Sequence, residues 1–175
     1  KMSARVEMQN GRPTLLINDS AVYPMIYALP DQPTGRWTWN ELAQHNIKLF
    51  AHKVGVKLVQ ADIFLDHIWM PDGTMNLDTA RMQVRGILDV CPDAAVMLRF
   101  HVNAPRWWQK MNPGEGIRYA NTDSVIKDYS IGFESLLSND VSNVQRFSFA
   151  SEKWKREAGE MTAKFCREFA KTKEG

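Results

Sequence analysis

The sequence has few cysteines, no long apolar run and no block of like charge. Its two cysteines, Cys91 and Cys166, are too few for a disulfide framework or a cysteine-rich zinc site, and both are expected to be small buried side chains on helices. No stretch reaches the ~20 apolar residues that a membrane-spanning helix requires. The 22 basic and 20 acidic residues are spread along the 175-residue chain, so composition favours no nucleic-acid partner.

Several motifs that carry chemistry are also missing. The sequence contains no glycine-rich phosphate loop, no nucleophile elbow and no dinucleotide-binding fingerprint. Asp66 and His67 are adjacent, but no third ligand follows at a convincing spacing, so we expect neither a metal nor a cofactor. Aromatic residues are plentiful, with six Trp, eight Phe and four Tyr. Aromatic rings pack in cores, and they also form platforms for the apolar faces of sugar rings.

The order of predicted elements indicates an α/β fold preceded by a β-hairpin. Asn10-Gly11 is a strong hairpin turn signal, and we assign residues 1–21 to the hairpin and residues 22–175 to the βα units. Apolar segments at residues 22–29, 56–65 and 94–102 are typical of buried parallel strands. Helices are predicted at 38–55, with a capping box of Thr38 and Glu41, and at 78–90 and 151–171. The apolar side of the first helix is expected to consist of Leu42, Ile47, Leu49 and Phe50. Residues 103–150 are predicted to be mostly irregular.

Strands that alternate with helices form parallel sheets joined by right-handed crossovers. Both a doubly wound sheet and a (β/α)8 TIM barrel fit this pattern. A complete barrel needs ~250 residues, so this chain supplies about three βα units, the N-terminal portion of such a barrel.

Polar and aromatic residues gather where the second and third predicted strands end, which is where parallel α/β folds place their sites. We predict that five of them bind substrate: Asp62, Arg99, His101, Asn103 and Trp107. Carboxylates and amides bind sugar hydroxyls, while aromatic faces cover the apolar side of the ring.

Each of these candidates also has a purely structural interpretation. Asp62 and Arg99 would serve equally well as an ion pair between neighbouring strands, and His101 as a hydrogen-bonded core residue. Trp107 and Trp108 are expected to be divided between the core and the cleft. Glycosidases typically use two carboxylates, but nothing in the surroundings of Glu115 or Glu134 marks either as catalytic.

Four segments resemble the early barrel of clan A glycoside hydrolases, and are most similar to β-galactosidase-like enzymes related to family 42. They are WMPDGTMNLD at 69–78, LRFHVNAPRWW at 98–108, the loop from Asn112 to Glu115, and SFASEKW at 148–154. The resemblance implies a retaining mechanism, with one Glu after the fourth strand as acid/base and another after the seventh as nucleophile. Neither has a counterpart in this sequence, so we expect no catalytic residue here and no hydrolysis by this chain alone. The resemblance also suggests a periplasmic or secreted bacterial setting.

Two other functions remain open. One is a non-catalytic carbohydrate-binding α/β domain that uses the same aromatic rim. The other is a complete, small doubly wound domain with an unrelated ligand. A partial barrel would leave sheet edges uncovered, and self-association through those edges is therefore expected.

Overall fold

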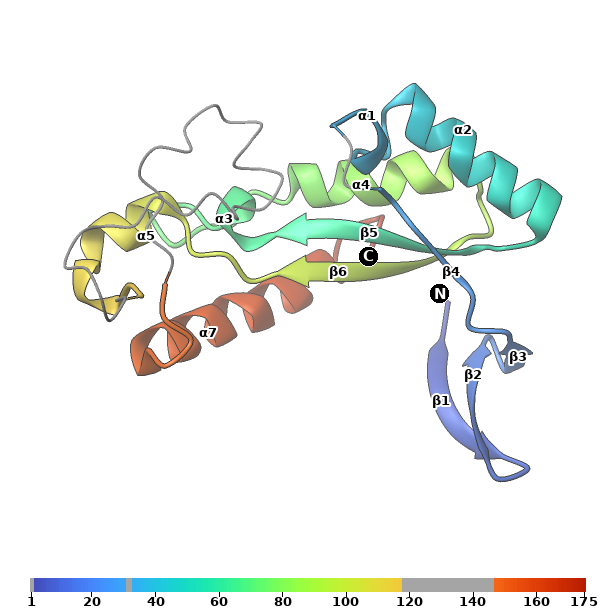
Figure 1. Ribbon diagram of the computed structural model, residues 1–175, viewed down its shortest axis with the longest axis horizontal. Coiled ribbons are helices and arrows are strands. Elements are labelled where there is room, and N and C mark those ends of the chain that lie inside the picture. Colours follow the sequence, from blue (N-terminus) through green and yellow to red (C-terminus); the bar gives the residue numbers. More distant parts are fainter. Residues whose placement is uncertain (1, 31–32, 118–146) are drawn as a thin grey trace.

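The computed structural model describes residues 2–30, 33–117 and 147–175, and these residues form two sheets. The first sheet is antiparallel, in the order β1 (Ala4–Gln9), β2 (Arg12–Ile17) and β3 (Ser20–Val22). The second is parallel, in the order β4 (Ile26–Ala28), β5 (Leu58–Phe64) and β6 (Ala95–His101). The antiparallel sheet projects from the end of the molecule at which β5 and β6 begin (Figure 1).

Helices connect and cover the parallel strands. After β4 come α1 (Pro33–Arg36) and α2 (Glu41–Leu49), which continues into a π-helical turn, η1 (Phe50–Val54). After β5 come α3 (Leu65–Ile68) and α4 (Asp78–Leu88), and after β6 come α5 (Arg106–Met111), the 3-10 turn η2 (Pro113–Glu115) and α7 (Glu152–Phe169). None of the helices in the described part of the chain is long and apolar enough to cross a membrane.

The predicted hairpin turn is confirmed. Asn10 and Gly11 both have positive φ, 51° and 74°, as a type I′ turn requires, and Gln9 faces Arg12 across it. A second left-handed pair, Asn18 and Asp19, turns the chain into β3.

The hydrophobic core lies on one face of the parallel sheet. Val59 and Ala61 of β5 pack with Ala43 and Ile47 of α2 and with Ile87 of α4. A second cluster joins Ile63 to Val84 of α4, to Trp108 of α5, and to Trp154 and Phe165 of α7, with Phe100 of β6 packed against it. On the opposite face, Ile26 of β4 and Met97 of β6 are exposed. Among the described residues the parallel sheet is therefore open, with helices packed on one side.

The predicted mixed α/β architecture and the two long amphipathic helices are confirmed. Ala80, Val84 and Ile87 are buried on α4, and Trp154, Ala158, Phe165 and Phe169 are buried on α7. Ser151 caps α7, because its side chain accepts a hydrogen bond of 2.9 Å from the Trp154 N–H.

Several local predictions were wrong. The apolar segment at 22–29 is not one strand: β3 ends at Val22 and β4 begins at Ile26. Thr38 does not cap α2, which begins at Glu41 with Asn40 at its N-cap position and no side-chain cap bond. Of the residues expected on the apolar side of that helix, Ile47 is buried, whereas Leu42, Leu49 and Phe50 are exposed.

The cysteine prediction is half right for each residue, because Cys91 is buried but lies after the end of α4, and Cys166 lies on a helix but is exposed. Both thiols are free, but only Cys91 is buried and Cys166 lies on the exposed side of α7. In the described part of the segment at 103–150, α5 and η2 form short helical turns, and residues 118–146 lie outside the described residues. Glu134 lies outside the described residues.

Candidate functional site

An ion pair between two adjacent strands forms the floor of the candidate site. Asp62 of β5 and Arg99 of β6 are directly opposite in the parallel register and point to the face opposite the two core clusters. Arg99 donates two parallel hydrogen bonds to the Asp62 carboxylate, from Nε to Oδ1 at 2.6 Å and from Nη2 to Oδ2 at 2.8 Å. This bidentate arrangement fixes both side chains in one orientation.

The Asp62 carboxylate is ionised despite being buried. Only 2% of the residue is exposed. Burial alone raises its pKa, but the neighbouring His101 and Arg99 outweigh that effect and lower the pKa of Asp62 to about 2. A second guanidinium contributes, because Arg36 Nε lies 3.6 Å from Oδ2 and its guanidinium carbon lies 5.2 Å from the centre of the Phe64 ring. An acid this strong is suited to accepting hydrogen bonds and unsuited to donating a proton near neutral pH.

His101 lies beside the floor at the end of β6. It is in register with Phe64 of β5, and the two rings stack with centroids 4.4 Å apart. Its Nε2 atom is buried, and its closest described partner is Asp62 Oδ1 at 3.4 Å, a contact too long for a well-formed hydrogen bond. A ligand hydroxyl would give this nitrogen the partner that a buried polar atom normally has.

Asp66 is a second carboxylate in a different environment. It follows β5 in α3, and burial raises its pKa above the ordinary value, while the charge of His67 and a hydrogen bond with Asn103 act in the opposite direction. Its Oδ1 atom is buried without a hydrogen-bond partner among the described residues. The site thus holds one strongly ionised carboxylate and one that retains its proton to a higher pH.

Two tryptophans on the segment after α1 form an aromatic platform. The rings of Trp37 and Trp39 stack with centroids 5.0 Å apart and planes inclined by 14°. The Trp37 ring also contacts the Phe64 ring edge-on, and its centroid lies 6.3 Å from that of the His67 ring. These contacts place the platform beside the end of β5. Trp39 is 37% exposed, so an apolar face is available to a ligand.

A single buried glutamine holds this platform against the sheet. Gln83 of α4 is fully buried; its Oε1 accepts a bond of 2.9 Å from the Thr38 N–H, and its Nε2 donates to Asp62 O at 3.1 Å. The Thr38 hydroxyl in turn donates to the Gln83 carbonyl at 2.7 Å. Gly86 makes the close approach feasible, because a Cβ there would lie 2.5 Å from Thr38 Oγ1.

The structure brings together four of the five predicted substrate-binding residues: Asp62, Arg99, His101 and, through its bond to Asp66, Asn103. Trp107 lies apart from them. It packs edge-on against Trp69, and its Nε1 donates to the Trp69 carbonyl at 3.1 Å, within the core cluster on the helix side. Trp108 is buried, as predicted for one member of the pair.

Sequence reasoning missed part of the site. Arg36, Trp39 and Gln83 come from segments whose position relative to the strand ends depends on tertiary contacts. The Trp-Thr-Trp sequence at 37–39 was the available signal, since neighbouring aromatics in a loop after a strand often face a ligand. Glu115 does not belong to the site, because it accepts a hydrogen bond from Ser151 at the start of α7.

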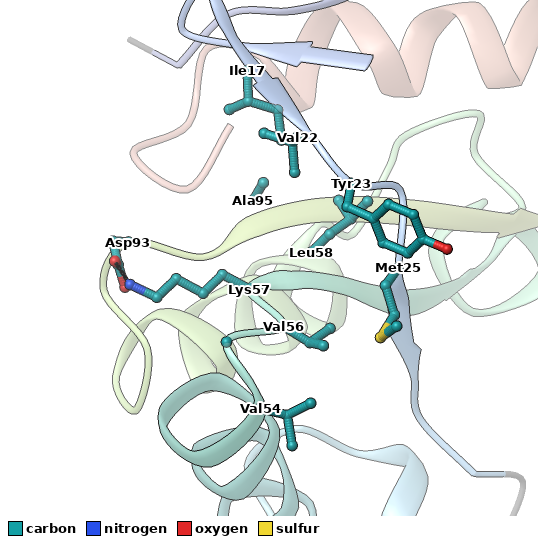
Figure 2. A pocket seen from close by; sticks show the side chains of 11 residues that line it. Ile17, Val22, Tyr23, Met25, Val54, Val56, Lys57, Leu58, Asp93 and Ala95 are labelled. Atoms are coloured by element: carbon teal, nitrogen blue, oxygen red, sulfur yellow. Dashed lines mark hydrogen bonds and ion pairs between the residues drawn. The ribbon is translucent and has the colours of Figure 1, made fainter. Parts of the chain in front are cut away.

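A separate pocket lies at the opposite end of the parallel sheet. Figure 2 shows it between the hairpin, which contributes Ile17 and Val22, and the first residues of β5 and β6, Leu58 and Ala95. Its volume is about 390 Å³, and the ion pair of Lys57 and Asp93 lies at its margin. Sites in parallel α/β folds form at the carboxyl ends of strands, which favours the cluster around Asp62 over this pocket.

Within residues 2–30, 33–117 and 147–175, no group of three or more His, Cys, Asp or Glu side chains is placed to hold a metal ion. Comparison of the sequence with models of known protein families and with curated proteins finds no match in either.

Proposed function

We propose that the chain is the N-terminal part of a (β/α)8-barrel glycoside hydrolase of the β-galactosidase-like type, and that its strand-end face binds carbohydrate. The observation that carries the proposal is the stacked pair of Trp37 and Trp39 beside buried polar groups at the ends of parallel strands. A pyranose ring has an apolar face and a rim of hydroxyls, and this site offers a surface for each.

The fold supports a barrel over a doubly wound sheet. Three consecutive strands lie in chain order, and α2, α4 and α7 contribute to the core on one face. Doubly wound sheets carry helices on both faces, whereas a barrel carries them only outside. The inner face of a barrel would then contain Asp62, Arg99 and His101.

The polar groups of the site support a neutral, hydroxyl-rich ligand. Asp66 Oδ1 and His101 Nε2 are buried atoms that make no hydrogen bond within the described residues. Unsatisfied buried polar atoms each cost about 1–3 kcal/mol, so a hydroxyl that bonds to them would contribute to affinity. The low pKa of Asp62 favours a role in hydroxyl recognition over one in proton donation.

Calorimetric titration of the 175-residue chain with galactosides and with other oligosaccharides tests the binding proposal. We expect Trp39→Ala to weaken binding of a sugar that the wild-type chain binds by roughly 3–10-fold, the effect of losing one aromatic stacking contact. Phe149→Ala is the matched control, because Phe149 is also an exposed aromatic residue but lies before α7 and contacts Phe147. Equal effects of the two substitutions, or no saccharide binding at millimolar concentration, would contradict the proposal.

An assay of hydrolysis distinguishes a glycoside hydrolase from a non-catalytic carbohydrate-binding domain. The proposal predicts no turnover of chromogenic β-galactosides by this chain alone, because Asp62 is held as an ion pair and the resemblance places both catalytic Glu residues outside this sequence. Turnover proportional to the concentration of the chain would refute that prediction. Binding without hydrolysis in the complete natural protein would instead favour the non-catalytic carbohydrate-binding domain.

A further inference from the structure

The outer strand of the hairpin is an open sheet edge. Among the described residues β1 pairs with β2 only, and Val6 and Met8 are 67% and 66% exposed. Natural edge strands are often protected by proline, by charged side chains and above all lysine, by a bulge or by a covering segment. Residues 4–9, Ala-Arg-Val-Glu-Met-Gln, contain neither proline nor lysine, and the pairing with β2 runs without a bulge.

The register with β2 determines which backbone groups of β1 face the open edge. The Ser3 carbonyl accepts from the Asn18 N–H at 2.9 Å, so Ser3 forms a hydrogen-bonded pair. Such pairs recur at every second residue of an antiparallel ladder, and Arg5, Glu7 and Gln9 therefore bond to β2. The N–H and C=O groups of the alternate residues, Ala4, Val6 and Met8, point outward.

The side chains of β1 are complementary to themselves in the antiparallel direction. If Val6 lies on a two-fold axis, Arg5 of one copy faces Glu7 of the other, and Ala4 faces Met8. The charged pairs lie on one face of the strand and the apolar pairs on the other. Arg5 and Glu7 are the only charged residues of β1, and both are solvent-accessible, at 47% and 42% of their side chains.

We propose that a second copy of this chain pairs with β1 across a two-fold axis through Val6, which joins two three-stranded sheets into one of six strands. Arg5 and Glu7 of opposite copies would occupy non-hydrogen-bonded positions, where facing Cα atoms are about 4.5 Å apart and side chains are closest. Within one chain, Arg5 already contacts Glu7 at 3.1 Å and also Asp19, and exposed pairs of this kind exchange partners at little cost. The contact is isologous, so it closes at a dimer.

Sedimentation equilibrium of the full chain, from about 1 µM to about 1 mM and with reductant present to prevent oxidation of exposed Cys166, tests the proposal. We expect a concentration-dependent dimer. Arg5→Glu places two glutamates opposite one another at both symmetric positions and should raise the dimer Kd about tenfold or more. Arg12→Glu is the matched control, since it makes the same charge change on the inner strand β2 and should leave the Kd unchanged.

Charge exchange distinguishes an interface contact from a folding defect. The double substitution Arg5→Glu with Glu7→Arg restores both pairs and should recover the wild-type Kd. An equimolar mixture of the two single variants should form heterodimers, although each variant alone dimerises poorly. Val6→Pro removes an outward N–H that β2 does not use, and should abolish dimerisation while circular dichroism and Tm stay close to wild type.

Two results would overturn the proposal. One is a strictly monomeric wild-type chain at about 1 mM. The other is a dimer whose Kd is insensitive to Arg5→Glu and Val6→Pro, which would move the interface elsewhere, for example to the edges of the parallel sheet. Saccharide binding at Asp62 should be the same for all of these variants, because the hairpin lies at the opposite end of that sheet (Figure 1).

Discussion

Replacement of Gln83 by leucine should destabilise the protein by about 3 kcal/mol, although the change conserves side-chain volume. Gln83 is fully buried, and its amide forms bonds of 2.9 Å with the Thr38 N–H and 3.1 Å with the Asp62 carbonyl. Leucine removes both partners and leaves a backbone donor and a backbone acceptor buried without compensation. Each such group costs about 1–3 kcal/mol, so the two together cost about 2–6 kcal/mol, and partial relaxation places the sum in the lower half of that range.

Urea unfolding followed by tryptophan fluorescence measures this loss directly. We expect a lower midpoint with an unchanged slope, since the surface exposed on unfolding stays the same. Gln44→Leu on the neighbouring helix α2 is the control, because the Gln44 amide makes only one contact, of 3.4 Å, with the Gly86 carbonyl. That variant should lose less than about 1 kcal/mol. If Gln83→Leu costs no more than the control, Gln83 does not hold the Trp37–Trp39 segment against the sheet.

Two further predictions concern the same region. Gly86→Ala should lower the free energy of unfolding by about 1–3 kcal/mol, measured by thermal unfolding, because the added Cβ would lie 2.6 Å from the Thr38 carbonyl. Gly159→Ala on α7 is the control, because a Cβ there meets nothing within 4 Å. That substitution should raise the free energy of unfolding by about 0.5–1 kcal/mol. Equal effects at the two glycines would refute the close approach. The pKa of Asp62 is lowered to about 2 from an ordinary value of 3.8, so its ion pair should stabilise the fold fully above about pH 4 and lose about 2 kcal/mol as the pH falls toward 2. Asp62→Asn should remove that part of the pH dependence of urea unfolding, and an unchanged acid slope would contradict it.

Helices α4 and α7 could be predicted because their large apolar residues recur at helical spacing and pack on a sheet. The same reasoning was only partly right for α2, where Ile47 of the predicted apolar side is buried. The other buried positions are Ala43 in α2 and Ala51 in the following turn η1, small residues that let the helix approach the sheet closely, while Leu42 and Leu49 are exposed. Pattern analysis weights residues by hydrophobicity and therefore favours the larger side chains.

The ion pair of Asp62 and Arg99 could be predicted from the sequence, but the position of the aromatic platform could not. Asp62 and Arg99 lie at the ends of recognisable strands, and parallel pairing brings such ends together. Thr38 looked like a local cap, yet its hydroxyl and N–H bond to Gln83, 45 positions away. Contacts between segments so distant in sequence leave no local pattern, so the position of Trp37 and Trp39 over the strand ends could not be derived.

Asp62 links the two parts of the site. Its carboxylate is fixed by Arg99 on the open face of the sheet, and its carbonyl accepts from the glutamine that holds Thr38, between the two stacked tryptophans. Asp62 therefore fixes both the ion pair with Arg99 and the aromatic platform of Trp37 and Trp39, and all of these hydrogen bonds form without a ligand. A ligand that enters such a site need not order these side chains, so less of its interaction energy is lost on binding. The same arrangement explains why substitutions at Gln83 and Gly86, neither of which faces the open side of the sheet, are expected to weaken saccharide binding together with stability.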